Sequence, residues 1–257
     1  MNWEKLMWED GSFRDLFILD VHGHIGAHRP FQLGAHFGSD VAKTVRRVGV
    51  DAVVVSSLPS IASDYVWGNN QVKDACEADP DVIYGYAVPN PYYEDCDLTP
   101  WLDLPNFRGV KVHGSMQGEV QLNDHRYDSA YELANARKLP VLVHAWCPWE
   151  IEAAADVAER FKDLTIILGH SGMTFRDDAI KAAKEHENIL IDTAISSTVD
   201  LAVETLVDAV GVDRVVYGSD ICFFDCTHTL GKIAMAKLSD DDKEKIFDLN
   251  AKALFRM

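Results

Sequence analysis

Basic residues are scarce in this chain. Its 257 residues include 24 Lys and Arg against 41 Asp and Glu, which gives a net charge of −17 at pH 7. A nucleic-acid-binding protein needs a basic surface for the phosphates, so we expect no nucleic acid as a partner. A small anionic substrate is compatible with this charge, because a few local Arg or Lys side chains can make one pocket positive.

Long hydrophobic runs are also missing. No segment approaches 18 consecutive apolar residues, so we expect no membrane span. The N-terminal stretch Met1-Asn2-Trp3-Glu4-Lys5 lacks the basic start and apolar core of a signal peptide. These two absences predict a cytoplasmic protein.

Cysteines are few and odd in number. The five are scattered, which predicts free thiols in a cytosolic chain of this size, and their positions are Cys76, Cys96, Cys147, Cys222 and Cys226. Cys222 and Cys226 lie close together just after Asp220. A metal-binding pair there is the alternative to two loop thiols near a pocket.

Apolar runs recur regularly along the chain. Most are rich in Val, Ile or Leu with little alternation, which is typical of strands buried on both faces of a parallel sheet. The eight runs cover residues 16–21, 50–56, 82–88, 108–113, 140–144, 165–170, 189–193 and 214–219. Other segments have apolar residues at helical spacing and are predicted to be helices. They cover residues 38–48, 127–138, 150–162, 177–187, 199–210 and 239–257.

Eight strand–helix units in about 250 residues match the size of one (β/α)8 TIM barrel. We therefore predict a single α/β domain over residues 1–257, with a metal site at the C-terminal mouth of the barrel. The doubly wound open sheet is the main competitor. It would not bring the ends of strands one, five, six and eight around one point, whereas a closed barrel does.

The motif Asp20-Val21-His22-Gly23-His24 follows the first apolar run, which we expect to end at the His pair. Side chains alternate faces along a strand, so Asp20, His22 and His24 should point the same way. Two imidazoles on one side of a strand end can bind one metal ion. The alternative is a polar strand end whose imidazoles bond to neighbouring carbonyls.

Three further apolar runs end in metal-type residues. They lead into His144, His170 and Asp220. Scattered structural histidines have no reason to prefer the C-terminal ends of strands, so this repetition favours the metal interpretation. Neutral imidazoles and a carboxylate are ligands that suit Zn²⁺.

The motifs together resemble the amidohydrolase superfamily, and more specifically the amidohydrolase-related (amidohydrolase 2) family. That family includes aminocarboxymuconate-semialdehyde decarboxylase and related metal-dependent hydrolases and lactonases. The resemblance covers nearly the whole chain and rests on residues 20–24, 109–113, 143–144, 168–172, 217–220 and 250–255. Their order and spacing are more specific than any one motif.

The resemblance implies one divalent metal, most often zinc, held by His22, His24, His144 and Asp220. It implies two catalytic residues. Asp220 would accept the proton of a metal-bound water and pass it to the leaving group, and His170 would polarise the scissile group. The resemblance also implies a homo-oligomer.

Five residues are candidates for substrate binding. Lys111 and His113 share a face at the end of the fourth strand. In two-metal members of the superfamily such a lysine is carboxylated, but substrate-anion binding or a structural charge is the interpretation we favour for Lys111. Arg29 and Arg176 could each clamp a carboxylate, and Trp146 would form an apolar wall.

Two enzyme functions fit this set of residues. The first is a metal-dependent hydrolase that opens an amide, ester or lactone bond of a small molecule. The second is a non-oxidative decarboxylase of an aromatic or unsaturated acid. A barrel that binds metal or ligand without turnover, and a metal-independent lactonase, are the remaining alternatives. Specificity should come mainly from the loop after His24, residues 57–70 and the stretch after Asp220.

Overall fold

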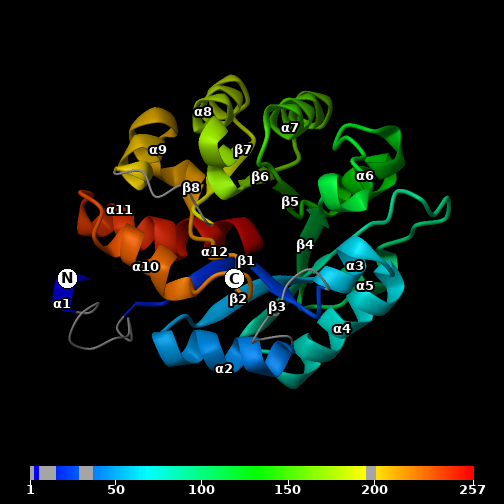
Figure 1. Ribbon diagram of the computed structural model, residues 1–257, viewed down its shortest axis with the longest axis horizontal. Coiled ribbons are helices and arrows are strands. Elements are labelled where there is room, and N and C mark those ends of the chain that lie inside the picture. Colours follow the sequence, from blue (N-terminus) through cyan, green and yellow to red (C-terminus); the bar gives the residue numbers. More distant parts are fainter. Residues whose placement is uncertain (1–2, 6–15, 29–36, 195–200) are drawn as a thin grey trace.

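A computed structural model describes residues 3–5, 16–28, 37–194 and 201–257 of the protein. Eight parallel strands form one sheet in sequence order, each hydrogen-bonded to the next. They are β1 (Leu19–Ile25), β2 (Ala52–Ser57), β3 (Ile83–Ala87), β4 (Phe107–Val112), β5 (Val141–His144), β6 (Ile166–Gly169), β7 (Ile189–Asp192) and β8 (Val215–Val216). The sheet curls into a ring with the helices outside it (Figure 1).

The ring closes between β1 and the segment that follows β8. The amide of Val21 donates to the carbonyl of Tyr217 at 2.9 Å, and the amide of Asp220 donates to the carbonyl of His22 at 2.7 Å. Gly23 forms a parallel bridge with Ile221. These contacts confirm the predicted TIM barrel and bring Asp220 beside the two histidines of β1.

The helices lie before β1, between successive strands and after β8. They are α1 (Trp3–Lys5), α2 (Gly38–Val48), α3 (Leu58–Ala62), α4 (Tyr65–Ala78), α5 (Thr99–Leu102), α6 (Asp128–Arg137), α7 (Pro148–Arg160), α8 (Arg176–Glu185), α9 (Ala202–Val210), α10 (Cys226–Ala234), α11 (Asp240–Glu244) and α12 (Asn250–Phe255). In α2, Val41, Val45 and Val48 are buried at helical spacing, and Gly49 ends the helix in the left-handed conformation that favours glycine.

Two apolar layers hold the barrel together. One lies between the strands and the surrounding helices. The other fills the barrel interior, where Leu19, Val21, Leu142 and other inward-facing side chains pack with Phe255 of α12. The ring of Tyr86 meets that of Phe255 edge to face, with centroids 6.1 Å apart. The terminal helix therefore packs against the barrel interior, whereas the histidines lie at the C-terminal ends of the strands.

Some sequence-based boundaries were wrong. The first strand was expected to end at the His pair, but β1 continues through it to Ile25 because Gly23, His24 and Ile25 pair with β2. The last strand is much shorter than residues 214–219, since β8 is only Val215–Val216. By contrast, the predicted helix at 239–257 is confirmed as a continuous helical segment from Asp240 to Phe255, capped by Ser239, whose middle part at Lys245–Leu249 has a wider turn.

Residues 57–70, predicted to contribute to specificity, form the end of β2, helix α3 and the start of α4, and Leu58 among them lines the main pocket described below. Pro59 lies in the first turn of α3, and the carboxylate of Asp64 caps α4 by accepting the amide of Trp67 at 2.9 Å. Trp67 is exposed, while Tyr65 packs edge to face on Trp101.

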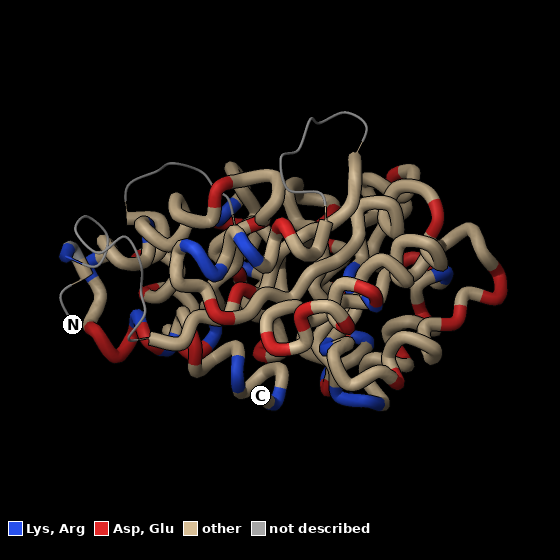
Figure 2. Tube along the Cα trace, turned by 90° about the horizontal axis from the view of Figure 1, so that it is seen from below, with Lys and Arg blue, Asp and Glu red and all other residues tan. Residues whose placement is uncertain are grey.

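The five cysteines are free, as expected. Acidic residues are spread along the whole described trace rather than gathered in one place (Figure 2). Among the described residues, we find no helix that has both the length and the apolar character needed to cross a bilayer.

Candidate active site

Donor atoms from β1 and from the segment after β8 converge at the C-terminal end of the barrel. Nε2 of His24 lies 3.1 Å from Oδ1 of Asp220, and Nε2 of His22 lies 3.6 Å from the same oxygen. One ligand atom from each of these three residues lies within 4.8 Å of the others. All three side chains are buried.

The other ring nitrogens of the two histidines are held by neighbours. Nδ1 of His22 donates to Oδ2 of Asp192 at 2.6 Å. Nδ1 of His24 lies 2.9 Å from the hydroxyl of Ser56. Such outer partners fix the orientation of an imidazole and leave Nε2 to face a metal ion.

The donor set fits a divalent cation. Burial, the largest cause, lowers the pKa of His22 well below its ordinary value and also lowers the pKa of His24, so both rings are held neutral. Neutral imidazole is the form that binds a metal. Oδ1 of Asp220 is buried and accepts no hydrogen bond from the described part of the chain. A buried carboxylate oxygen of this kind suits a metal ligand.

His144 takes a different arrangement from the one the sequence suggested. Its Nδ1 lies 3.0 Å from Nε2 of His170, and its ring stacks on that of His113 with centroids 3.8 Å apart and planes 12° apart. It belongs to a second group of donors, with His113 and Glu150. The structure thus groups three of the four predicted ligands and places the fourth beside them, in contact with His170.

The second group is poorly arranged to chelate a metal through both rings. An imidazole binds a metal in its own plane, and the planes of His113 and His144 are nearly parallel and stacked. Oε2 of Glu150 accepts the amide of Trp146 at 2.8 Å and the thiol of Cys147 at 3.2 Å. Glu150 therefore stabilises the start of α7.

Lys111 is buried in the barrel directly below this site. Its Nζ lies 3.1 Å from Nε2 of His22. Burial lowers the pKa of Lys111 to about 8, against the opposing effect of the Asp220, Asp192 and Glu150 carboxylates. A lysine with a lowered pKa beside a candidate metal ligand is a candidate for chemistry rather than for surface charge.

A pocket of about 420 Å³ opens above the donors. His24, His113, His144, His170 and Asp220 line it, and its apolar walls are Leu58, Met116, Trp146, Phe223 and Phe224. His28 and Ser115 also line it. A pocket with apolar walls and a few converging polar groups is typical of a small-molecule site.

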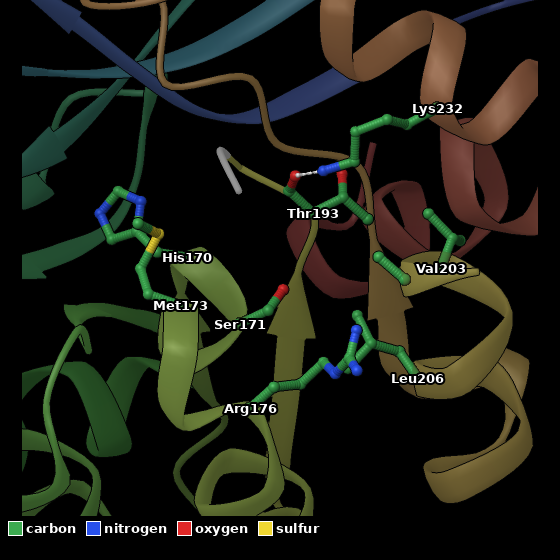
Figure 3. A pocket seen from close by; sticks show the side chains of 9 residues that line it. His170, Ser171, Met173, Arg176, Thr193, Val203, Leu206 and Lys232 are labelled. Atoms are coloured by element: carbon green, nitrogen blue, oxygen red, sulfur yellow. Dashed lines mark hydrogen bonds between the residues drawn. The ribbon is translucent and has the colours of Figure 1, made fainter. Parts of the chain in front are cut away.

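Of the two predicted arginines, only Arg176 lies among the described residues, and it does not line this pocket. Arg29 lies outside the described residues. Arg176 begins α8 and lines a separate small cavity (Figure 3). Of the described lining residues, His170 is the one that this cavity shares with the main pocket. Cys222 and Cys226 belong to neither group of metal-type residues.

Sequence reasoning missed Asp192. Besides His22, it binds the backbone at the end of the preceding strand, β6, since its Oδ1 accepts the amide of His170 at 2.7 Å. The signal was present, because Asp192 ends the apolar run Ile189-Leu190-Ile191 as Asp220 ends another. Ser56 at the end of β2 carried no comparable signal.

One protein-family model matches nearly the whole chain. The amidohydrolase family model (Amidohydro_2) matches residues 20–257. The chain belongs to the amidohydrolase family. A sequence search among curated proteins found no match.

Solved structures share the amidohydrolase fold at low sequence identity. A 2,6-dihydroxybenzoate decarboxylase from Rhizobium is 16% identical with a TM-score of 0.73, over 94% of this chain and 99% of that chain. A structure of such a decarboxylase with bound 2,6-dihydroxybenzoate is also similar, with a TM-score of 0.74.

Two further structures extend the range of activities. A 5-carboxyvanillate decarboxylase from Novosphingobium aromaticivorans, solved with manganese and 4-hydroxy-3-methoxy-5-nitrobenzoic acid, is 13% identical with a TM-score of 0.74, over 95% and 97% of the two chains. A 4-oxalomesaconate hydratase from Rhodopseudomonas palustris is 16% identical with a TM-score of 0.69, over 93% and 96%. At this identity the likeness establishes the fold alone.

Proposed function

We propose that the protein is a divalent-metal-dependent, non-oxidative decarboxylase of a small aromatic or unsaturated carboxylic acid. The observation that carries this proposal is the pocket in which metal-type donors face a wall of aromatic side chains. Two similar structures support it over the hydrolase that the sequence favoured. Both are decarboxylases that were solved with an aromatic acid bound.

The pocket walls suit a flat, unsaturated substrate. Trp146, Phe223 and Phe224 present aromatic surface, and Leu58 and Met116 add aliphatic contacts. Aromatic rings pack favourably edge to face or offset on such side chains. Its volume of about 420 Å³ lies within the range of ordinary small-molecule sites.

The metal ligands in this proposal are His22, His24 and Asp220, with His144 as the fourth. A bound divalent metal would supply a Lewis acid for the substrate's oxygen atoms. The similar structure with manganese makes Mn²⁺ a candidate beside Zn²⁺. The neutral imidazoles suit zinc, whereas a carboxylate ligand is compatible with either ion.

Decarboxylation breaks the bond between the carboxyl carbon and its neighbour. The electron pair stays on that neighbour, which takes up one proton as CO2 leaves. Asp220 and His170 line the pocket on two sides and are the residues we propose to hold and move this proton. Trp146 packs at 5.3 Å, centroid to centroid, on the His170 ring and so helps to position it.

Lys111 is proposed as a buried positive charge below the ligands. Its ammonium group near His22 and Asp220 would favour anionic groups at the site. His113 would contact substrate from the pocket wall, where Ser115 lies 3.2 Å from its Nδ1. Arg29 stays a candidate for carboxylate binding.

A metal-dependent hydrolase is the second candidate. The same ligands could activate a water, and Asp220 lies beside them to accept its proton. Activity assays separate the two functions. The metal-loaded protein would be incubated with 2,6-dihydroxybenzoate and 5-carboxyvanillate while CO2 release is measured, and with esters, lactones and amides while acid release is measured.

CO2 release that is lost in Asp220→Ala supports the proposal. Acid release from a lactone, ester or amide without any CO2 from the acids would establish the hydrolase instead. Binding of metal with no product from either panel would favour a non-catalytic barrel. Full activity after complete removal of metal would contradict both metal-dependent candidates.

Elemental analysis tests the metal site itself. We expect about one divalent ion per chain, since the three grouped donors form a single cluster. Asp220→Ala should lose it. About two ions per chain would instead indicate that Lys111 is carboxylated and bridges them.

A further inference from the structure

A second, smaller cavity lies next to the active-site pocket and shares His170 with it. Its volume is about 20 Å³. Its walls come from the turn after β6, from the end of β7, from the first turn of α9, and from α10. They include Ser171, Arg176, Thr193 and Lys232. Figure 3 shows Arg176 and Lys232 reaching this space from opposite sides.

Arg176 is the first positively charged side chain at this cavity. Its Nε and Nη1 are buried, and neither forms a hydrogen bond with any residue that the structure describes. A guanidinium stays charged under all ordinary conditions, and burying unsatisfied donors costs free energy. An anion in the cavity that accepts a hydrogen bond from one of these donors would satisfy part of this side chain.

Lys232 of α10 brings a second positive group to the same cavity. Its Nζ lies 3.4 Å from the carbonyl oxygen of Thr193. Burial lowers the pKa of Lys232 to about 8, while the Asp192 carboxylate opposes that effect. An anion between the two cations would favour the charged amine and relieve the repulsion between them.

The first turn of α9 adds a third favourable feature. Ala202 and Val203 line the cavity, so the beginning of this helix borders it. The N-terminal end of a helix carries partial positive charge and favours anions. The preceding residue, Leu201, has no polar side chain with which to cap the helix.

The size of the cavity limits the ligand. About 20 Å³ holds one or two water-sized groups, which excludes an aromatic ring. We propose that Arg176 and Lys232 bind one carboxylate-sized anion in this cavity. The anion is either a free species such as formate or the carboxylate of a bound substrate, and the second source rests on the proposed function.

Arginine side-chain NMR tests the proposal without turnover, so its outcome is independent of the proposed activity. Formate would be titrated into ¹⁵N-labelled, zinc-loaded protein in chloride-free buffer. The Nε–H resonance of Arg176 would be identified by its loss in Arg176→Gln. We expect it to shift saturably, with a Kd of about 1 mM or weaker given the small number of atoms in formate.

A matched pair of variants distinguishes this site from formate bound to zinc. Lys232→Gln should weaken the formate affinity at Arg176 about tenfold, because a charged hydrogen-bond donor is lost. Lys184→Gln removes the same charge from the exposed face of α8 and should leave the affinity unchanged. No saturable shift, or equal affinities in these two variants, would overturn the proposal.

The source of the anion follows from a second titration. If 2,6-dihydroxybenzoate shifts the Arg176 resonance and competes with formate, the substrate's carboxylate is the ligand. If formate binds and the aromatic acid has no effect, the site takes a free anion. Both outcomes support an anion site, and they differ in whether it contributes to substrate recognition.

Discussion

At the scale of single residues, Asp192 joins two parts of the candidate site. One of its oxygens accepts the Nδ1–H of His22, and the other accepts the amide of His170. The carboxylate is fully buried, so these contacts are shielded from water. It therefore orients a proposed metal ligand and the backbone of a proposed catalytic residue together.

Asp192→Asn should weaken metal binding. An amide replaces the charged acceptor of the His22 ring, and losses of such outer partners commonly reduce metal affinity or activity about 10- to 100-fold. Chelator competition would measure the affinity. Asp208→Asn on the exposed face of α9 removes the same charge and serves as the control. An unchanged affinity in Asp192→Asn would show that the ring orientation does not depend on this carboxylate.

His144 and His170 are in contact, but we expect different effects from replacing them. His144→Ala should lose metal and activity together if His144 is the fourth ligand. His170→Ala should keep most of the metal and lose turnover, because His170 is proposed to act on substrate. Metal content and activity of each purified variant would be compared. Equal metal loss in both would identify His170 as a ligand.

At the scale of elements, close packing between β6 and β1 depends on a glycine. A Cβ on Gly169 would lie 2.8 Å from the carbonyl oxygen of Val143 and 3.1 Å from Cε1 of His22. The first contact is with backbone, which cannot move aside as a flexible side chain would. Gly169 therefore allows β5, β6 and the His22 ring to approach closely.

Gly169→Ala should displace β6 or the His22 ring. Overpacking of this kind typically lowers the free energy of unfolding by about 1–3 kcal/mol. Urea denaturation would measure it, together with metal content. Lys184→Ala on the surface of α8 should change stability by less than about 0.5 kcal/mol. A Gly169→Ala protein with wild-type stability and metal content would show that the strands have room to adjust.

At the scale of the whole molecule, the buried imidazoles should make the metal-free protein sensitive to acid. Burial is the main cause that lowers the pKa of five histidines below their ordinary value, namely His22, His24, His113, His144 and His170. The unfolded chain binds protons at these groups first as pH falls below about 6.5, so acid favours unfolding.

Two buried carboxyl groups oppose this effect. Burial raises the pKa of Asp20 to about 7, and it also raises the pKa of Asp192. Between about pH 4 and pH 7 the folded state holds more protons at these groups, so their contribution to stability increases as pH falls. The imidazoles outnumber them, which leaves a net loss of stability in acid.

We expect the free energy of unfolding of the metal-free protein to fall between about pH 7.5 and pH 5.5. The two carboxyl groups offset two of the five buried imidazoles, and each of the remaining three contributes about 1.4 kcal/mol per pH unit. The slope should therefore steepen toward at most about 4 kcal/mol per pH unit. Urea denaturation at several pH values would measure it. Stability that rises as pH falls would mean that the carboxyl groups dominate.

The strand ends were predictable from sequence because they depend on local pattern. Apolar runs that lead into His144, His170 and Asp220 indicated a barrel with a polar C-terminal end, and the fold and family are confirmed. The ligand set, the substrate-binding residues and the assignment of residues 1–257 to one domain stay predictions. The ends of elements were less predictable, since β8 is shortened where the chain turns toward β1.

The sequence by itself determined the alternation of strands and helices, the acidic charge and the residue types at the strand ends. Tertiary structure decided which of these side chains meet. It paired His22 with Asp192, turned His144 toward His170 and placed Arg176 in a separate cavity with Lys232. The physical reason is that periodicity fixes the face of a strand, whereas ring orientation and loop path depend on contacts between residues far apart in the chain.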